Sequence, residues 1–115
     1  MIFIVDIDQT ICYTPLIDGV HHYDQSVPMK HRIDHINKLY DQGATIIYWT
    51  ARGSGSGIDW TELTHKQLND WGCKFHEIRL GKPSYDVWVD DKAFNDREFF
   101  FHADRDFELT GYNDE

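Results

Sequence analysis

Six polar side chains at the ends of apolar stretches could do chemistry together. They are Asp6, Asp8, Thr50, Lys82, Asp90 and Asp91. Carboxylates can hold a divalent cation, attack an electrophile or transfer a proton, whereas a hydroxyl and an amine can bind an anion. The set therefore suits a reaction on an anionic group, provided that the fold gathers its members in one place.

The apolar stretches that precede these side chains predict four strands. They cover residues 2–5, 44–49, 75–80 and 86–89. The first is a continuous run rich in β-branched residues, which is typical of a strand buried on both faces within a parallel sheet. Because parallel strands deliver their carboxyl ends to the same edge of a sheet, where ligands bind, we expect the six side chains to converge there.

Helices are predicted between the strands. One runs from about Pro28 to Gln42, with Ser26 as its cap and Gly43 after its last turn. The other begins at the cap Asp59, with Glu62 as its capping-box partner, and stops at Gly72. Strands that alternate with helices indicate an α/β fold with a central parallel sheet.

Two loops are predicted to border the site. Residues 9–28 show no period and contain two prolines and a glycine, which predicts a long loop or flap of the kind that is often functional. Residues 52–57 are rich in glycine and serine but lack the G-x-x-x-x-G-K-[ST] pattern, so we expect a mobile rim. The triplet 99–101 is expected to pack on the core, and the acidic stretch 104–115 is weakly patterned.

Each of these signals is weak by itself. An Asp-x-Asp after a strand is more often a turn or a helix cap, and an Asp pair at the start of a loop is commonly solvated. A lone threonine or lysine at a strand end usually has no special role. The occurrence of all of them in this order, each at the end of a strand, favours a functional site over coincidence.

Composition limits the classes of partner. The length fits one domain over residues 1–115, and the net charge of −9 disfavours broad binding to nucleic acid, although a local cation can still admit one small anion. Cys12 and Cys73 lie far apart in no metal-binding spacing, so we expect reduced thiols. The apolar start is too short for a signal peptide and no window approaches a membrane span, which predicts a cytoplasmic protein.

The motifs resemble those of the haloacid dehalogenase (HAD) superfamily. Asp6-Ile7-Asp8-Gln9-Thr10 is similar to its first motif, D-x-D-x-T, and Thr50 and Lys82 are similar to its second and third. The ending Val87-Trp88-Val89-Asp90-Asp91 resembles the fourth. The resemblance spans residues 2 to about 98 and is closest to small phosphatases without a cap domain in capsule-sugar biosynthesis. It implies a HAD-like Rossmannoid three-layer fold with no true cap.

The same resemblance implies a role for each residue. Asp6 is the nucleophile that forms an aspartyl phosphate, and Asp8 is the general acid and base. The Thr50 hydroxyl, with Ala51 and Arg52 after it, binds the phosphoryl oxygens, while Lys82 offsets negative charge. Because a carboxylate and a phosphate ester repel each other, a cation must lie between them, and Mg²⁺ suits Asp6, the Asp8 carbonyl, Asp91 and, directly or through its neighbours, Asp90.

The implied function is hydrolysis of a small phosphomonoester, with a sugar phosphate as first choice. A nucleic-acid or nucleotide 3′-phosphatase is the alternative within enzymes, and the acidic charge argues against it. A receiver-like phosphoacceptor or a silent binding domain is the alternative outside enzymes, although receivers separate their acidic pair from a phosphorylated Asp in mid-chain. A neighbouring subunit could cover so exposed a site, which leaves a homo-oligomer open.

Three features stand beside this interpretation. Gln9 departs from the glycine or asparagine usual in the first motif, which puts the geometry of the flap's turn in question. His21 and His22 are expected to be a solvated pair in the flap. His31 and His35 have the spacing of a zinc pair but no E-x-x-H context, so we expect no zinc there.

Overall fold

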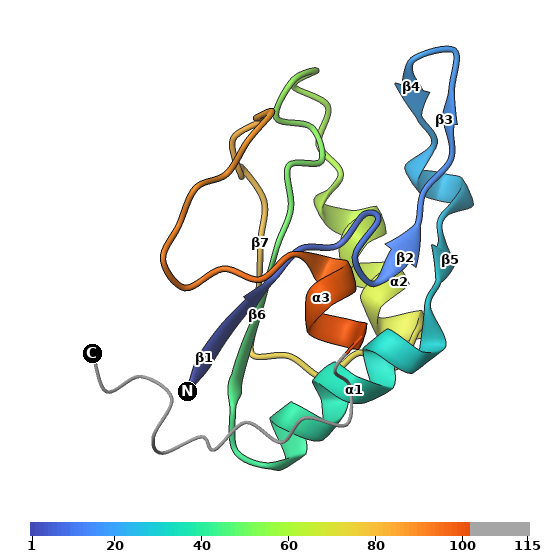
Figure 1. Ribbon diagram of the computed structural model, residues 1–115. Helices are drawn as coiled ribbons and strands as arrows, with labels where there is room; N and C mark the ends of the chain where they lie inside the picture. Colours follow the sequence, from blue (N-terminus) through green and yellow to red (C-terminus); the bar gives the residue numbers. More distant parts are fainter. Residues whose placement is uncertain (102–115) are drawn as a thin grey trace.

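The computed structural model describes residues 1–101, which form an α/β fold. A parallel sheet in the order β1-β6-β7 is built from β1 (Ile2–Val5), β6 (Thr45–Trp49) and β7 (Glu77–Arg79). The helices are α1 (Lys30–Asp41), α2 (Thr61–Asp70) and α3 (Asp96–Phe101). Figure 1 shows α1 following the flap and crossing back to β6, which is the connection that a parallel pair of strands needs.

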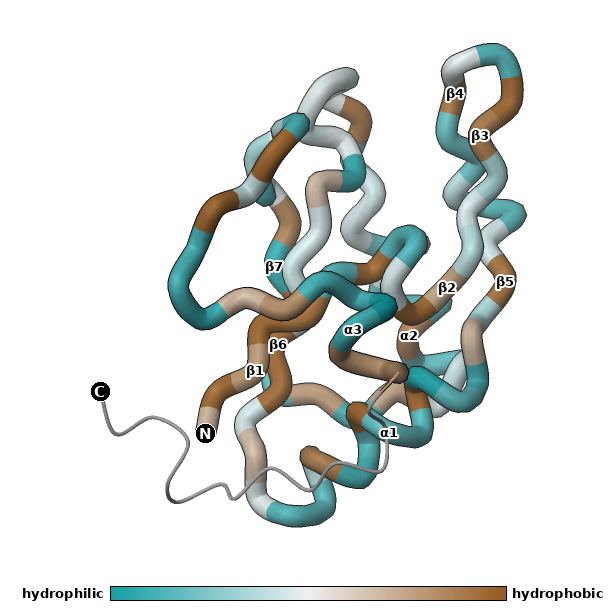
Figure 2. Tube along the Cα trace, in the orientation of Figure 1, coloured by the Kyte–Doolittle hydropathy of each residue, from teal (hydrophilic) through white to brown (hydrophobic). Residues whose placement is uncertain are grey.

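The core lies between the sheet and the helices. Its fully buried members include Ile46 and Tyr48 of β6, Ile33 of α1 and Leu68 of α2. On α1, the buried residues Ile33, Ile36 and Leu39 recur at the spacing of one helix face, which is why the sequence pattern could identify this helix. Figure 2 shows that the apolar positions gather on β1 and β6, whereas the outer turns of α1 are largely polar.

The predicted loop over residues 9–28 is a flap that stands away from the sheet. It contains the two-residue strands β2 (Cys12–Tyr13), β3 (Leu16–Ile17), β4 (Val20–His21) and β5 (Val27–Pro28), and the short 3₁₀ helix η1 (Tyr23–Gln25). β3 pairs with β4, and β2 pairs with β5, both antiparallel. The flap therefore rises as a narrow hairpin beside the carboxyl edge of the sheet (Figure 1).

The prediction that the first strand is buried on both faces is wrong. Ile2 is 67% exposed and Ile4 is 58% exposed, whereas Val5 is buried. The reason is that only one face of β1 is covered, because Phe3 and Val5 lie on the face that packs on the core and Ile2 and Ile4 lie on the opposite face. β1 is also an edge strand, since among the described residues it pairs only with β6, in the register Ile2 to Thr45 and Val5 to Tyr48.

The predicted fourth strand over residues 86–89 does not form. This segment belongs to a long irregular loop that bulges away from β1 (Figure 1), and Val87 and Val89 are 76% and 91% exposed. A strand is defined by its ladder of hydrogen bonds, and a short apolar run carries no information on whether a partner edge is engaged. Among the described residues, β1 therefore has β6 on one side and no strand on the other.

The helix starts also differ from the sequence prediction. α1 is capped by Met29 with no side-chain hydrogen bond, and Ser26 instead lies 2.6 Å from the Thr14 hydroxyl. The α2 cap is Trp60, while Asp59 accepts a hydrogen bond from the Thr61 amide at 2.9 Å. Asp59 therefore still satisfies the first free amide of α2, one residue outside its assigned cap, whereas the prediction that Ser26 caps α1 is wrong because its hydroxyl is paired with Thr14.

The expectation for the aromatic triplet 99–101 is met only in part, and that for the two cysteines is met. Phe99 and Phe100 pack against the core as expected, whereas Phe101 is 84% exposed. Both cysteines are free and buried. Between residues 1 and 101 no helix has the length and apolar character that crossing a membrane demands. The expectation for residues 104–115 lies outside the described residues.

Candidate active site

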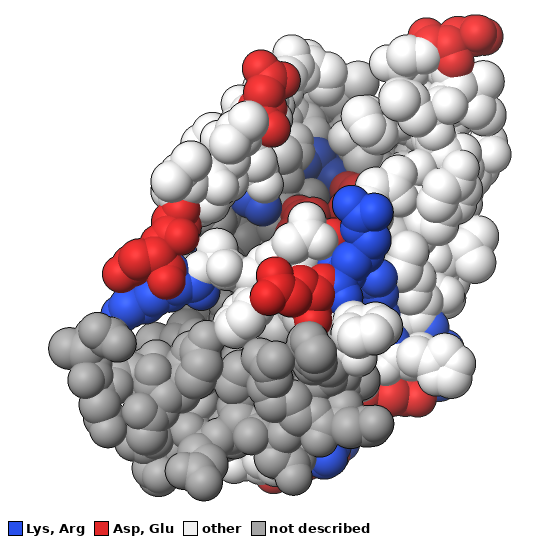
Figure 3. Space-filling model, in the orientation of Figure 1, with Lys and Arg blue, Asp and Glu red and all other residues white. Residues whose placement is uncertain are grey.

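Four of the predicted residues meet at the carboxyl edge of the sheet. Asp6 and Asp8 follow β1, Thr50 follows β6 and Lys82 comes after β7. All four line a cleft of about 670 Å³, and Ala51 and Arg52 line it as well. Its walls are the flap hairpin on one side and the Gly-Ser loop on the other. Figure 3 shows a hollow on this face of the molecule in which basic and acidic side chains lie together.

Thr50 ties the ends of the strands to one another. Its amide donates to the Arg79 carbonyl at 2.9 Å, and its carbonyl accepts from the Lys82 amide at 3.1 Å. The buried hydroxyl accepts from the Arg52 amide at 3.1 Å. The main chain around Thr50 therefore fixes where Lys82 leaves the sheet and holds the start of the Gly-Ser loop against it.

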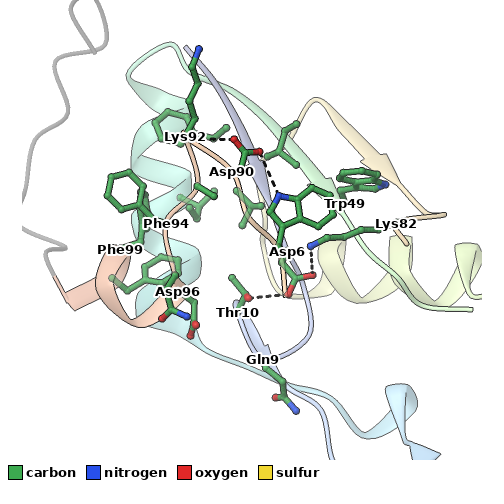
Figure 4. A pocket seen from close by; sticks show the side chains of 18 of the residues that line it. Asp6, Gln9, Thr10, Trp49, Lys82, Asp90, Lys92, Phe94, Asp96 and Phe99 are labelled. Carbon is green, nitrogen blue, oxygen red and sulfur yellow. Dashed lines mark hydrogen bonds and ion pairs between the residues drawn. The ribbon is translucent and has the colours of Figure 1, made fainter. Parts of the chain in front are cut away.

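Asp6 lies between a cation and a hydroxyl. The Lys82 Nζ is 3.6 Å from Asp6 Oδ1, and the Thr10 hydroxyl donates to Asp6 Oδ2 at 3.0 Å (Figure 4). Burial raises the pKa of Asp6, and the charge of Lys82, the Thr10 hydroxyl and the Ile7 amide only partly oppose that rise. Lys82 and Thr10 thus orient the carboxylate from both sides but offset only part of the cost of burying its charge. This arrangement suits a group that reacts with an electrophile.

Asp8 is held by a buried arginine. Arg52 Nη2 donates to Asp8 Oδ1 at 2.8 Å and Arg52 Nε donates to Asp8 Oδ2 at 2.9 Å. The Thr14 hydroxyl donates to Oδ1 at 2.5 Å. The Asp8 side chain is 18% exposed, and that of Arg52 is not exposed at all. The sequence-based role of Arg52 as a direct substrate contact is therefore not what its side chain does in this arrangement.

The turn between Asp8 and the flap is made by Gln9, where the sequence left the geometry in question. Gln9 has a φ of 63°, in the left-handed region where glycine and asparagine are favoured. Its side chain compensates, because Nε2 donates to the Thr14 carbonyl at 2.8 Å and Oε1 accepts from the Thr14 amide at 3.2 Å. The Gln9 side chain therefore holds the turn between Asp8 and the flap to Thr14.

The Gly-Ser loop is anchored at two points. Gly53 has a φ of 82°, and a Cβ on it would lie 2.1 Å from the Ile58 carbonyl oxygen. The Ser54 hydroxyl donates to the Lys82 carbonyl at 2.7 Å. Gly55, in contrast, has open space around it. The loop is therefore fixed by close contacts at Gly53 and Ser54, whereas its tip at Gly55 has no close neighbour on the side where a Cβ would lie.

Asp90 and Asp91 do not join the other two carboxylates. Asp90 Oδ1 accepts from the Lys92 amide at 3.1 Å and Oδ2 accepts from Trp88 Nε1 at 3.4 Å (Figure 4). Hydrogen bonds, first of all that from the Lys92 amide, lower the pKa of Asp90. Within residues 1–101, no three His, Cys, Asp or Glu side chains are grouped so that they could hold a metal ion. The predicted Mg²⁺ ligand set is not assembled in this arrangement.

A second and larger cavity lies between Asp6 and Asp90. It measures about 1010 Å³ and is lined by the exposed edge of β1, by Trp49 and Trp88, and by the residues before α3. It joins the site at Asp6 and Lys82, which line both cavities.

Sequence reasoning missed the residues behind Asp8. Thr14 comes from the flap, and Thr64 and Gln67 come from α2; all three are buried polar side chains. One signal was present, since Thr64 and Gln67 recur on the helix face that also carries Leu68. Polar residues at core positions need buried partners, and here the partner is Arg52.

Comparisons with known proteins support the fold alone. No family model matches the chain, and no curated protein is similar to it. Among solved structures, the chain is similar to the crystal structure of a structural target from Vibrio cholerae, with a TM-score of 0.75 and 24% identity over 93% of this chain and 90% of that one. The likeness covers nearly all of both chains, so the α/β arrangement described above also occurs in an experimentally determined protein.

Proposed function

We propose that this protein is a Mg²⁺-dependent phosphomonoester hydrolase of the HAD type, which acts through an aspartyl phosphate on Asp6. The observation that carries the proposal is the pair Asp6 and Asp8 in one cleft, with Lys82 Nζ 3.6 Å from the first and Arg52 clamped onto the second. Two carboxylates placed two residues apart but held by different partners are suited to different tasks, one as nucleophile and one as acid and base.

The reaction has two steps. Asp6 attacks phosphorus and forms a new P–O bond while the bond to the leaving oxygen breaks, and Asp8 gives that oxygen its proton so that it departs as an alcohol. Asp8, now ionised, takes a proton from water as the water oxygen attacks phosphorus and the bond to Asp6 breaks. Inorganic phosphate leaves, and both carboxyl groups return to their starting states.

The other cleft residues bind the transferred group. The amine of Lys82 faces Asp6 at a distance where it can offset negative charge on both the nucleophile and the phosphoryl group. The Thr50 hydroxyl and the main chain of Ala51 and Arg52 lie at the same edge of the sheet and supply further polar groups. The flap and the Gly-Ser loop wall the cleft, which favours a small phosphorylated metabolite as the substrate, with a sugar phosphate as first choice.

Mg²⁺ is the cation that we propose for this site, with Asp6, the main-chain carbonyl of Asp8, Asp91 and, directly or through its neighbours, Asp90 as its ligands. The described arrangement does not fit it, because Asp90 is turned to Trp88 and Lys92 and no three carboxylate, His or Cys side chains of residues 1–101 are grouped. No step above is therefore derived through the cation. We expect that a fit requires residues 86–91 to approach the free edge of β1, where Ile2 and Ile4 are exposed and the larger cavity leaves room.

A labelling experiment tests the proposal. In a single turnover of an aryl phosphate labelled in its phosphoryl group, with enzyme in excess and with Mg²⁺ present, acid quenching should trap the phosphoryl label on Asp6. In heavy-oxygen water the solvent oxygen should appear in inorganic phosphate, because water attacks phosphorus. A sharper readout is fluoroberyllate, which mimics a phosphoryl group and should inhibit the protein and occupy Asp6. Hydrolysis that persists undiminished in Asp6→Asn would rule out the covalent route.

A further inference from the structure

The guanidinium of Arg52 has no donor to spare for a substrate. Nε donates to Asp8 at 2.9 Å and Nη2 donates to Asp8 at 2.8 Å and to the Ser26 hydroxyl at 3.4 Å. Nη1 donates to Gln67 Oε1 at 2.6 Å and to Thr64 Oγ1 at 3.2 Å. An arginine side chain has five N–H donors, and these contacts use all of them. A phosphoryl oxygen could bind Arg52 only by displacing one of these buried partners.

The flat face of Arg52 is also occupied. Its Cζ lies 4.8 Å from the centre of the Tyr23 ring, which is within range of a cation–π contact. The Tyr23 carbonyl accepts from Gln67 Nε2 at 2.6 Å, and the Tyr23 ring packs edge-on against Trp60, with centroids 5.1 Å apart. Arg52 is therefore locked in its plane by the flap and by α2 together.

The two oxygens of Asp8 differ as a result. Oδ1 accepts from Arg52 Nη2, from the Thr14 hydroxyl at 2.5 Å and weakly from Cys12 Sγ at 3.7 Å, so its lone pairs are used. Oδ2 has the single contact with Arg52 Nε among the described side chains. A carboxylate oxygen has two lone pairs, so Oδ2 retains one that can carry a proton.

From this geometry we propose that Arg52 is the positioning residue of Asp8: its bidentate pair fixes the carboxylate plane and reserves Oδ2 for proton transfer to the leaving group and from water. This inference rests on the proposed phosphatase function. It also assigns a purpose to the buried polar side chains of α2, because Thr64 and Gln67 orient Arg52, which in turn orients Asp8. Bidentate pairing of an arginine with a carboxylate gives geometric specificity that a lysine cannot reproduce.

The alternative is that the ion pair only fastens the flap to α2. The two accounts differ in what the loss of Arg52 should do to catalysis. A fastening role predicts a loss of stability and a fall in activity that is equal for all substrates. A positioning role predicts a loss that depends on how much the leaving oxygen needs a proton, and that disappears when Asp8 can no longer supply one.

The test is a double-mutant cycle between Arg52→Lys and Asp8→Asn, measured on an alkyl phosphate and on a nitrophenyl phosphate. Arg52→Lys keeps the positive charge but removes the bidentate geometry. We expect its kcat on the alkyl phosphate to fall by roughly 10²-fold, the lower end of what general acid catalysis contributes, with a smaller fall on the nitrophenyl phosphate and an unchanged KM. In the Asp8→Asn background the same substitution should have no further effect.

Two more variants keep the result interpretable. Gln67→Leu removes an acceptor of Nη1 without touching Asp8, and it should show the same dependence on the leaving group with a smaller size. Arg32→Lys alters another partly buried arginine, whose Nη1 pairs with Asp96 at 2.8 Å. It should change melting temperature without changing the ratio of the two kcat values.

Each other outcome overturns the proposal. A raised KM with unchanged kcat would make Arg52 a substrate contact. Equal losses on both esters that add to those of Asp8→Asn, or failure of both Arg52→Lys and Gln67→Leu to fold, would make the pair a structural fastening. If wild-type protein with Mg²⁺ hydrolyses neither ester, the proposed function itself fails, and that result is distinct because it needs no variant.

Discussion

The ammonium group of Lys82 lies 3.6 Å from the carboxylate of Asp6, although the two residues follow the outer strands β7 and β1 and β6 lies between them. The contact is possible because the main chain after β7 is bonded to Thr50 and crosses the end of β6. Lys82 is also within 5.4 Å of the Tyr85 ring and 5.6 Å of the Trp88 ring. The loop that carries Asp90 is thus connected to Asp6 through this lysine.

Replacing Asp6 by asparagine should abolish most of the activity without lowering the stability of the fold. Activity should fall by roughly 10⁴- to 10⁶-fold, the size typical of losing a catalytic nucleophile. Stability at neutral pH should not fall, because burial raises the pKa of Asp6 in the folded state. Such a group favours folding when protonated, and this contribution is lost as pH rises from the ordinary carboxyl pKa through the raised one. An amide resembles the protonated form at every pH.

The measurement is the melting temperature at several pH values in the presence of a chelator. The gap between Asp6→Asn and wild type should widen in favour of the variant as pH rises from about 4 to 7. Asp41→Asn is the matched control, because Asp41 is an exposed carboxylate paired with Lys74. It should give a change close to zero. An Asp6→Asn protein that is less stable than wild type at pH 7 would contradict the account.

Much of this site could be predicted from residue order alone. Asp6, Asp8, Thr50 and Lys82 converge because each follows a strand of one parallel sheet, and that rule needs only the strands to be found. The rule failed for Asp90 and Asp91, because residues 87–89 are apolar but belong to no strand. An apolar run indicates that a segment can be buried, but it does not indicate which strand of the sheet the segment pairs with.

The surroundings of Asp8 were beyond sequence reasoning for a different reason. From its place two residues after Thr50, Arg52 could be a substrate contact or a surface residue, but its side chain turns inward to Ser26 of the flap and to polar partners on α2. Those partners are polar residues on an otherwise amphipathic helix, and helical spacing places them on the core face without naming what they bind. Long-range polar pairing depends on how the elements dock, which no local pattern encodes.

Gly53→Ala should damage the rim of the cleft, whereas Gly55→Ala should not. A Cβ at position 53 would meet the Ile58 carbonyl oxygen at 2.1 Å, on a backbone with a positive φ. Strain of this kind costs about 1–3 kcal/mol, so the loop should shift and its contact with Lys82 should weaken. Position 55 has open space and should change stability by less than about 0.5 kcal/mol.

The kinetic readout compares a bulky phosphate ester with a small activated one. On the proposal that the rim, which lines the cleft, contacts the leaving group and not phosphorus, Gly53→Ala should raise KM for the bulky ester more than it lowers kcat for the small one. Gly55→Ala should leave both constants near wild type. Equal falls in kcat for both esters would assign the loop to the scaffold that supports Thr50 and Lys82.

The two cysteines should be chemically inert while the protein is folded. Burial, with the nearby charge of Asp8, raises the pKa of Cys12 to about 11, and burial raises that of Cys73 to about 12. At pH 8 only about one Cys12 in a thousand is then a thiolate, the form that reacts. Iodoacetamide should label neither residue in native protein and both in urea. Rapid native labelling of Cys12 would show that the flap opens.

The last prediction concerns the loop that carries Asp90 and its coupling to a metal ion. Trp88 Nε1 donates to Asp90 at 3.4 Å, and the Trp88 ring packs against Tyr85 and Trp49, with centroids 5.0 and 6.1 Å apart. If Mg²⁺ draws Asp90 and Asp91 toward Asp6, the bond to Trp88 must break and the indole must change its surroundings. Trp88 fluorescence should therefore change on adding Mg²⁺ and return with a chelator.

Matched variants assign that signal. Trp88→Phe should abolish most of the change, since the other three tryptophans lie on β6 or on α2 and its ends. Asp90→Asn and Asp91→Asn should shift the Mg²⁺ concentration at the midpoint upward, and Asp86→Asn, on the same exposed loop, should not. Hydrogen exchange provides the independent readout, because pairing of residues 86–89 with β1 would protect amides on both segments. A saturable Mg²⁺ signal without any new protection would place the metal site on the loop as it stands and would remove the need for a fourth strand.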